Sequence, residues 1–212
     1  MALTTKGLAT RRRILEGASA YLRSDSPGGV TLDDIRAITG TSKGQLFHYF
    51  PGGKDELLVA VAQFEADRVI SDQQPHLGAL TSWAAWQRWR DAVVARYRAQ
   101  GQYCPLATLM TQVGVTPGAA EVADSLLRHW QGYLTRGIAE MQANGGVDPN
   151  LDAERTAAAF VAGIQGGVQI LRSTGNSAHL EAAIDTLIDY LHSGGPGSNS
   201  ASACGTCSLP IS

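Results

Sequence analysis

The 212-residue chain lacks the features of a secreted, membrane-spanning or disulfide-rich protein. Its three cysteines, Cys104, Cys204 and Cys207, are too few and too poorly spaced for a disulfide framework. No apolar run is long enough to span a bilayer. The basic start runs straight into an amphipathic pattern and has no apolar core of the kind found in secretory signals. We therefore expect a cytoplasmic protein.

The constellations that carry catalysis or bind metal are also missing from the sequence. The five histidines are scattered without metal-ligand spacing, and no nucleophile elbow, P-loop or dinucleotide fingerprint is present. The single Cys-x-x-Cys pair at 204 and 207 has no further ligands beside it, so it does not supply a four-ligand zinc site. We predict a protein that is not an enzyme and needs no metal or cofactor.

Helical periodicity is what the sequence does have. No alternation of β-branched residues appears after Gln74, and Gly, Pro and Asn separate helix-length apolar patterns. The Gly/Ser-rich end carries no charge and is typical of a flexible tail. We predict an all-α fold with helices near 4–23, 55–73, 79–100, 104–113, 117–143, 152–174 and 177–193.

Between the first two of these helices, the run TLDDIRAITGTSKGQLFHYFPGGK (31–54) predicts two short helices joined by a tight turn. Thr31 with Asp34, and Ser42 with Gln45, have the spacing of capping boxes that would open the two helices. Gly40 stands where the chain must turn, because glycine takes the left-handed conformation without strain. Leu32, Ile35 and Ile38 share one face of the first helix, and Leu46 and Phe50 point to the core from the second. This is a helix-turn-helix pattern.

This run closely resembles the DNA-binding signature of the TetR/AcrR family of bacterial transcriptional regulators. In that family an aromatic cluster ends the recognition helix and a lysine starts the next, which corresponds here to Phe47–Phe50 and Lys54. Phe47 replaces the usual tyrosine and loses its hydroxyl. The link at 51–53 is one residue longer than the commonest form, as in the subgroup of multidrug- and flavonoid-responsive repressors.

The resemblance implies a ligand-responsive regulator, most simply a repressor that binds a palindromic operator as a homodimer. Lys43, Gln45 and His48 are the expected base readers, and Gly44 keeps the helix close to the groove. The full set of expected DNA contacts is Arg11, Thr31, Ser42, Lys43, Gly44, Gln45, Phe47, His48, Tyr49 and Lys54, with Thr31, Tyr49 and Lys54 as phosphate anchors. A helical small-molecule binding protein with a vestigial DNA-binding head is the alternative.

Charge is distributed in agreement with a DNA contact near the N-terminus, without proving it. Residues 1–60 hold 8 Lys/Arg against 6 Asp/Glu, whereas the remainder is net negative, within a total of −2. Solvated helix faces could produce the same count. The expected domains are a DNA-binding unit at 1–53, an effector-binding and dimerisation unit at 54–193, and a tail at 194–212.

Two further sets of residues follow from the composition of the second unit. Its aromatics could line an apolar effector cavity, although a plain helix-bundle core explains any one of them as well. This set is Trp83, Trp86, Tyr97, Tyr103, Cys104, Met110, Trp130 and Tyr133. The last two helices carry apolar and small residues that suit pairing with a second copy, although packing inside one chain could account for one stripe. The expected interface is Phe160, Ile164, Gly167, Leu171, Ile184, Leu187, Ile188 and Leu191.

Overall fold

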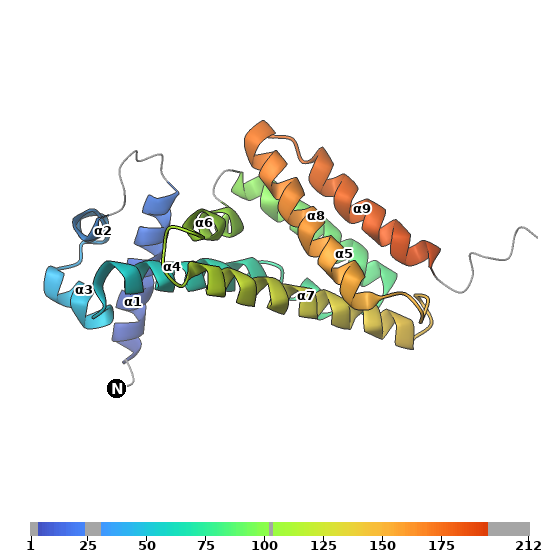
Figure 1. Cartoon of the computed structure of the whole chain (residues 1–212), viewed down its shortest axis with the longest axis horizontal. Helices are drawn as coiled ribbons and strands as arrows, with labels where there is room; N and C mark the ends of the chain where they lie inside the picture. The colour runs from blue at the N-terminus through green and yellow to red at the C-terminus, as the bar shows by residue number, and fades with distance from the viewer. Residues whose placement is uncertain (1–3, 24–30, 102–103, 195–212) are drawn as a thin grey trace, which may run out of the picture.

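The computed structural model describes residues 4–23, 31–101 and 104–194, and this part of the chain is helical without a strand. The predicted all-α fold is confirmed (Figure 1). The predicted tail at 194–212 and its two cysteines fall almost wholly outside the described residues, as does Tyr103. The helices are α1 (Thr5–Leu22), α2 (Leu32–Thr39), α3 (Lys43–Tyr49), α4 (Gly53–Ser71), α5 (Trp83–Gln100), α6 (Pro105–Gln112), α7 (Ala119–Ala143), α8 (Ala153–Thr174) and α9 (Ala178–Ser193), with a 3-10 turn, η1, at His76–Gly78.

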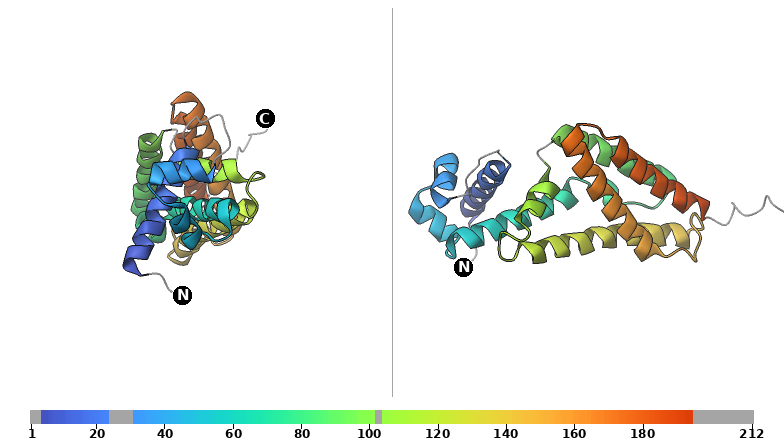
Figure 2. Two further views of the ribbon diagram at one scale, coloured as in Figure 1. Left: turned by 90° about the vertical axis from the view of Figure 1, so that its left-hand side faces the viewer. Right: turned by 45° about the horizontal axis from the view of Figure 1, so that its top comes forward.

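The molecule is elongated, with α1, α2 and α3 at one end and α8 and α9 toward the other (Figures 1 and 2). We call the first group the head and α5–α9 the body. Helix α4 joins them and contributes to both cores. Its buried Leu57 and Val61 pack with Ile14, Ile35 and Phe50 of the head, whereas Ala62, Ala66 and Val69 belong to the core of the body. The core of the head therefore extends past residue 53, where the sequence suggested a boundary.

An aromatic cluster forms the centre of the body. Trp86, Trp89, Trp130 and Phe160 have no exposed surface. The rings of Trp86 and Phe160 lie 5.4 Å apart, and those of Trp86 and Trp89 meet edge to face at 5.6 Å. Such packing stabilises a core beyond the area that it buries.

Helices α8 and α9 pack tightly against each other within one chain. A Cβ atom on Gly167 would lie 2.5 Å from the Cα atom of Leu180, so only glycine permits this approach. The apolar stripes that predicted a dimer interface are in fact turned inward, where they meet each other and the rest of the body. Of the eight predicted interface residues only Leu187 is partly exposed, and the others are buried in the single chain: Phe160, Ile164, Gly167, Leu171, Ile184, Ile188 and Leu191. Their assignment to a contact between copies was wrong, because periodicity shows an apolar face but not what covers it.

Two smaller points complete the fold. Ile35 is fully buried as expected, but Ile38 is 51% exposed and does not join the core face of α2. Within the ranges that the structure describes, no helix combines the length and apolar character needed to cross a bilayer.

Candidate nucleic-acid interface

Helix α2 begins and ends at the residues that the sequence singled out. The Thr31 hydroxyl accepts the N–H of Asp34 at 3.2 Å, and the Asp34 carboxylate accepts the N–H of Thr31 at 3.0 Å. Bonds from the hydroxyl and the backbone of Thr31 lower the pKa of Asp34. At the other end, Gly40 is left-handed with φ 59° and ψ 33°. An N-cap hydroxyl such as that of a threonine typically stabilises a helix by about 1 kcal/mol. Local chemistry therefore defines both the start of α2 and the turn before α3.

Helix α3 is opened by the second capping box. The Ser42 hydroxyl accepts the N–H of Gln45 at 3.2 Å, and the Gln45 side-chain oxygen accepts the N–H of Ser42 at 3.1 Å. Leu46 and Phe50 are fully buried and hold α3 on the head. The helix is thus anchored along one side and free along the other.

The free side of α3 carries the predicted base readers. Lys43, Gly44, Gln45 and His48 are all exposed, and α3 lies at the end of the molecule remote from α8 and α9 (Figure 1). A Cβ atom on Gly44 would meet nothing within 4 Å, so no internal contact requires glycine there. An exposed helix with an ammonium, an amide and an imidazole has the groups needed to contact phosphates and base edges.

The flanking aromatic residues and basic side chains complete this surface. Phe47 is 39% exposed and lies near Gly53, and Tyr49 is half-buried with its ring against His48. Lys54 is exposed in the first turn of α4, where the helix dipole disfavours a cation unless an anion is near.

Two of the predicted DNA contacts, Thr31 and Arg11, have roles inside the protein. The Thr31 hydroxyl both accepts from Asp34 and donates to its carboxylate. The Arg11 guanidinium lies 5.3 Å from the centre of the Phe50 ring, a cation–π distance. Thr31 is first of all a helix cap, and Arg11 covers the head core, so a phosphate would compete with these contacts.

Sequence reasoning missed Arg13, which fastens α1 to the turn. One of its guanidinium nitrogens donates to the Thr39 carbonyl, near the C-terminal end of α2. Arg13 belongs to the basic start of the chain, and nothing local in the sequence indicated a partner 26 residues away.

Comparison with known proteins places both parts of the chain in one family. Residues 14–61 match the family model described as "Bacterial regulatory proteins, tetR family". Residues 82–187, half of the chain, match the model "Tetracyclin repressor-like, C-terminal domain". The chain belongs to the TetR family of transcriptional regulators.

Individual TetR-family relatives are distant. An uncharacterised HTH-type transcriptional regulator of Mycobacterium tuberculosis is 24% identical over 110 residues, which is 49% of this chain and 53% of that protein. The transcriptional repressor AcnR of Corynebacterium efficiens is 36% identical over 64 residues, 30% of this chain and 34% of that one. The chain thus matches about half of the first relative's length and a third of the second's.

Solved structures share the whole fold. A TetR regulator from Chloroflexus aurantiacus has a TM-score of 0.73 at 23% identity, over 88% of this chain and 96% of that one. A TetR-family regulator from Cytophaga hutchinsonii has a TM-score of 0.76 at 19% identity, over 92% and 99%. The predicted family is confirmed, whereas the multidrug- and flavonoid-responsive subgroup stays a prediction.

In the part of the chain that the structure describes, the predicted effector residues of this TetR-family chain are spread over the body core and two surface grooves, with Trp83 near the end of α9. Trp86, Tyr97, Cys104 and Trp130 are buried in the body core. Trp83 stacks on exposed His192, with ring centres 3.4 Å apart, near the end of α9. Met110 lines a groove of about 400 Å³ between α6 and α8, and Tyr133 lines another of about 400 Å³ between α4 and α7.

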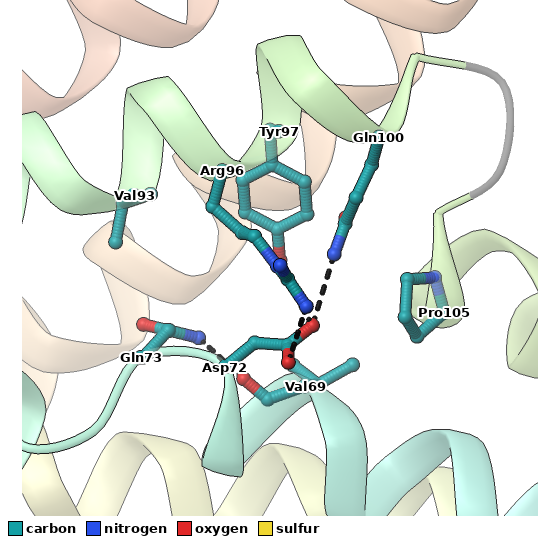
Figure 3. Close-up of a pocket in the computed structure, with 8 residues that line it drawn as sticks. All are labelled: Val69, Asp72, Gln73, Val93, Arg96, Tyr97, Gln100 and Pro105. Atoms are coloured by element: carbon teal, nitrogen blue, oxygen red, sulfur yellow. Dashed lines mark hydrogen bonds and ion pairs between the residues drawn. The ribbon is translucent and has the colours of Figure 1, made fainter.

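A small cavity lies where the C-terminal end of α4 meets α5 and α6. Arg96, Tyr97 and Gln100 extend from α5 toward Asp72 (Figure 3). Asp72 accepts bonds at 3.0 Å from Arg96 and 2.9 Å from Gln100, and buried Gln73 accepts the indole N–H of Trp89 at 3.1 Å. Burial raises the pKa of the Tyr97 phenol well above its ordinary value, and the nearby Cys104 and Asp72 raise it further, so Tyr97 stays neutral. The space of about 10 Å³ holds at most one water molecule.

Proposed function

We propose that this TetR-family protein is a cytoplasmic repressor that binds a near-palindromic operator as a homodimer and is released by a small apolar or aromatic effector. The observation that carries the proposal is the outward face of α3, where Lys43, Gly44, Gln45 and His48 are exposed on a helix that a capping box opens and buried side chains hold on the head. Each copy would place α3 in one major groove, with half-sites about one helical turn apart.

The pairing of two copies would use the open faces of α8 and α9. Ala159, Ala162, Gly166 and Ile170 recur at helical spacing on the exposed side of α8, and Tyr190 of α9 is 54% exposed. Small side chains on an exposed helix allow a second helix to approach closely. This surface replaces the buried stripes named above.

The effector would act on the junction between α4 and α5. Asp72 and Gln73 tie the end of α4 to the body, and α4 continues into the head. The buried indole N–H groups of Trp86 and Trp130 have no acceptor among the described residues. Spare donors beside aromatic rings favour a ligand with an aromatic ring and an acceptor. A ligand that binds better with α4 displaced would shift the population away from the DNA-binding form.

Selection of bound sequences from a random DNA pool tests the proposal and should enrich one inverted repeat. In a gel-shift titration at fixed salt, Lys43→Ala should weaken binding of that repeat about tenfold or more and relax the preference at one base position of each half-site. Arg155→Ala removes a positive charge from the exposed start of α8 and should have little effect. The proposal fails if no sequence is enriched, or if Lys43→Ala binds the repeat as tightly as the wild type does.

The dimer surface has its own test in Gly166→Arg. A Cβ atom at Gly166 would meet nothing within 4 Å, and the position is exposed, so the single chain should fold normally. A buried, unpaired guanidinium would oppose pairing of two copies. Light scattering after gel filtration should show a monomer where the wild type is a dimer, while the circular dichroism spectrum stays helical. A dimer that persists at the same protein concentration would place the interface elsewhere.

A further inference from the structure

A buried carboxylate joins the head to α4. Glu65 lies on α4 and has no exposed surface. One of its oxygens, Oε1, accepts a hydrogen bond from the hydroxyl of Ser19, which is also fully buried. The same oxygen pairs with Arg23 at 3.2 Å and with Arg68 at 3.4 Å. Ser19 and Arg23 are one helical turn apart at the end of α1, so a single carboxylate holds one face of that helix.

Helix α1 connects Glu65 to the rest of the head, so the position of α1 on α4 also sets the position of α2 and α3. Arg13 of α1 bonds the Thr39 carbonyl of α2, and Ile14 packs in the same core as Ile35 and Leu46 of the two short helices. α1, α2 and α3 therefore form one packed unit. Glu65 lies between this unit and the body, beyond Val61 and next to Ala66, where α4 passes from one core to the other.

Stability alone gives a weak reason for a charge at this position. Burying a carboxylate costs free energy that its partners must offset, and an apolar residue of similar volume is often equally stabilising. Apolar contacts are not directional, however, and permit small rotations between helices. Charge-assisted hydrogen bonds require a defined distance and direction. An ion pair at the junction thus restricts the angle between α1 and α4 more than leucine would.

We propose that Glu65 is a positioning residue for operator recognition, which sets the angle at which the head leaves α4 through Ser19 and Arg23. In a dimer this angle determines the separation of the two α3 helices, and hence the spacing of half-sites that the protein accepts. The inference rests on the proposed function, because it concerns how operator spacing is selected.

Three variants and one control separate positioning from folding. Glu65→Leu removes all three polar contacts, and Ser19→Ala removes only the hydroxyl. Glu65→Gln keeps an oxygen acceptor and the side-chain shape but removes the charge. The control is Asp67→Asn, because Asp67 is an exposed carboxylate on the same helix. Among the described residues it accepts a bond only from Gln63, one turn away.

The first measurement is affinity for the selected operator and for versions with one base pair added or removed between half-sites. Glu65→Leu should bind the best operator about tenfold more weakly but lose less than twofold on the altered spacings, so that the preference flattens. Ser19→Ala should reduce the preference among spacings only in part, and Glu65→Gln should keep more of that preference than Glu65→Leu does. Asp67→Asn should match the wild type. Equal losses on every spacing, or no change, would overturn the inference, because a folding defect lowers all affinities together.

The second measurement needs no DNA and separates this inference from the proposed function. Nitroxide labels at exposed Ala37 of α2 and Ala139 of α7, introduced through encoded reactive side chains, report the distance between head and body within one chain. Chains diluted with unlabelled copies should give a narrow distance distribution in the wild type and in Asp67→Asn. Glu65→Leu should broaden or shift it. An unchanged distribution rejects the positioning role, whether or not the wild type binds an operator.

Discussion

Replacing Gly44 with leucine should leave the protein folded and reduce its operator affinity by about a hundredfold. The Cβ atom that the change adds would meet nothing within 4 Å in the protein, and leucine favours a helix more than glycine does. The free energy of unfolding should therefore stay constant or rise by up to about 1 kcal/mol. On DNA the side chain would hold α3 away from the groove, so several contacts worth about 1–3 kcal/mol each would weaken together.

Gly132→Leu is the matched control for this change. Gly132 is an exposed glycine of α7 that also has open space around its Cβ position. Gel-shift titration and thermal unfolding of both variants should show that Gly44→Leu alone loses operator binding, while both keep or gain stability. If Gly44→Leu binds the operator normally, α3 does not enter the groove with this face.

The neighbouring glycines of α8 should respond to alanine in opposite directions. Gly166→Ala should raise the free energy of unfolding by up to about 1 kcal/mol, because the position is open and alanine is the better helix former. Gly167→Ala should lower it by about 1–3 kcal/mol, since the new Cβ would lie 2.5 Å from the Cα atom of Leu180 and push α9 away. Urea unfolding of the two variants at equal protein concentration gives both values.

The difference should persist at several protein concentrations. A clash inside one chain does not depend on concentration, whereas a lost contact between copies does. If Gly167→Ala is as stable as the wild type, α9 can shift at no cost, and the tight packing described above does not hold the two helices together.

The helix-turn-helix was predictable because its determinants are local. Thr31, Gly40 and Ser42 act on backbone groups within a few residues of themselves, so the pattern alone indicated where α2 and α3 begin and where the turn lies. The burial of Leu46 and Phe50 followed from their spacing. Once Leu46 and Phe50 were assigned to the core, the remaining side chains of α3 had to form its outer face.

The roles of the body residues depend on contacts that spacing does not contain. Ile164 and Leu191 lie on apolar stripes, and such a stripe has the same period whether its partner is in the same chain or in another. Tryptophans such as Trp86 and Trp130 occur both in packed cores and in the walls of ligand cavities, and the sequence pattern around them does not distinguish the two. The structure shows that both residues are buried in the core of one chain.

Polar contacts between distant segments were the least predictable feature. Glu65 falls on the apolar stripe of α4, and a carboxylate at such a position signals a buried partner but does not identify it. Ser19 is 46 residues away, and nothing marks its hydroxyl as different from that of any other serine. Only the tertiary packing of α1 on α4 brings the two side chains together.

The cap at the start of α3 limits what Gln45 can recognise. The N–H of Ser42 is a donor, so the Gln45 amide must turn its oxygen toward Ser42 and its NH₂ group outward. A free glutamine can both donate to and accept from adenine, whereas this one presents only donors to the groove. The half-site should therefore carry a hydrogen-bond acceptor opposite Gln45, such as the O6 or N7 atom of guanine or the O4 atom of thymine. A residue that shapes the helix thus also restricts which bases the helix can read.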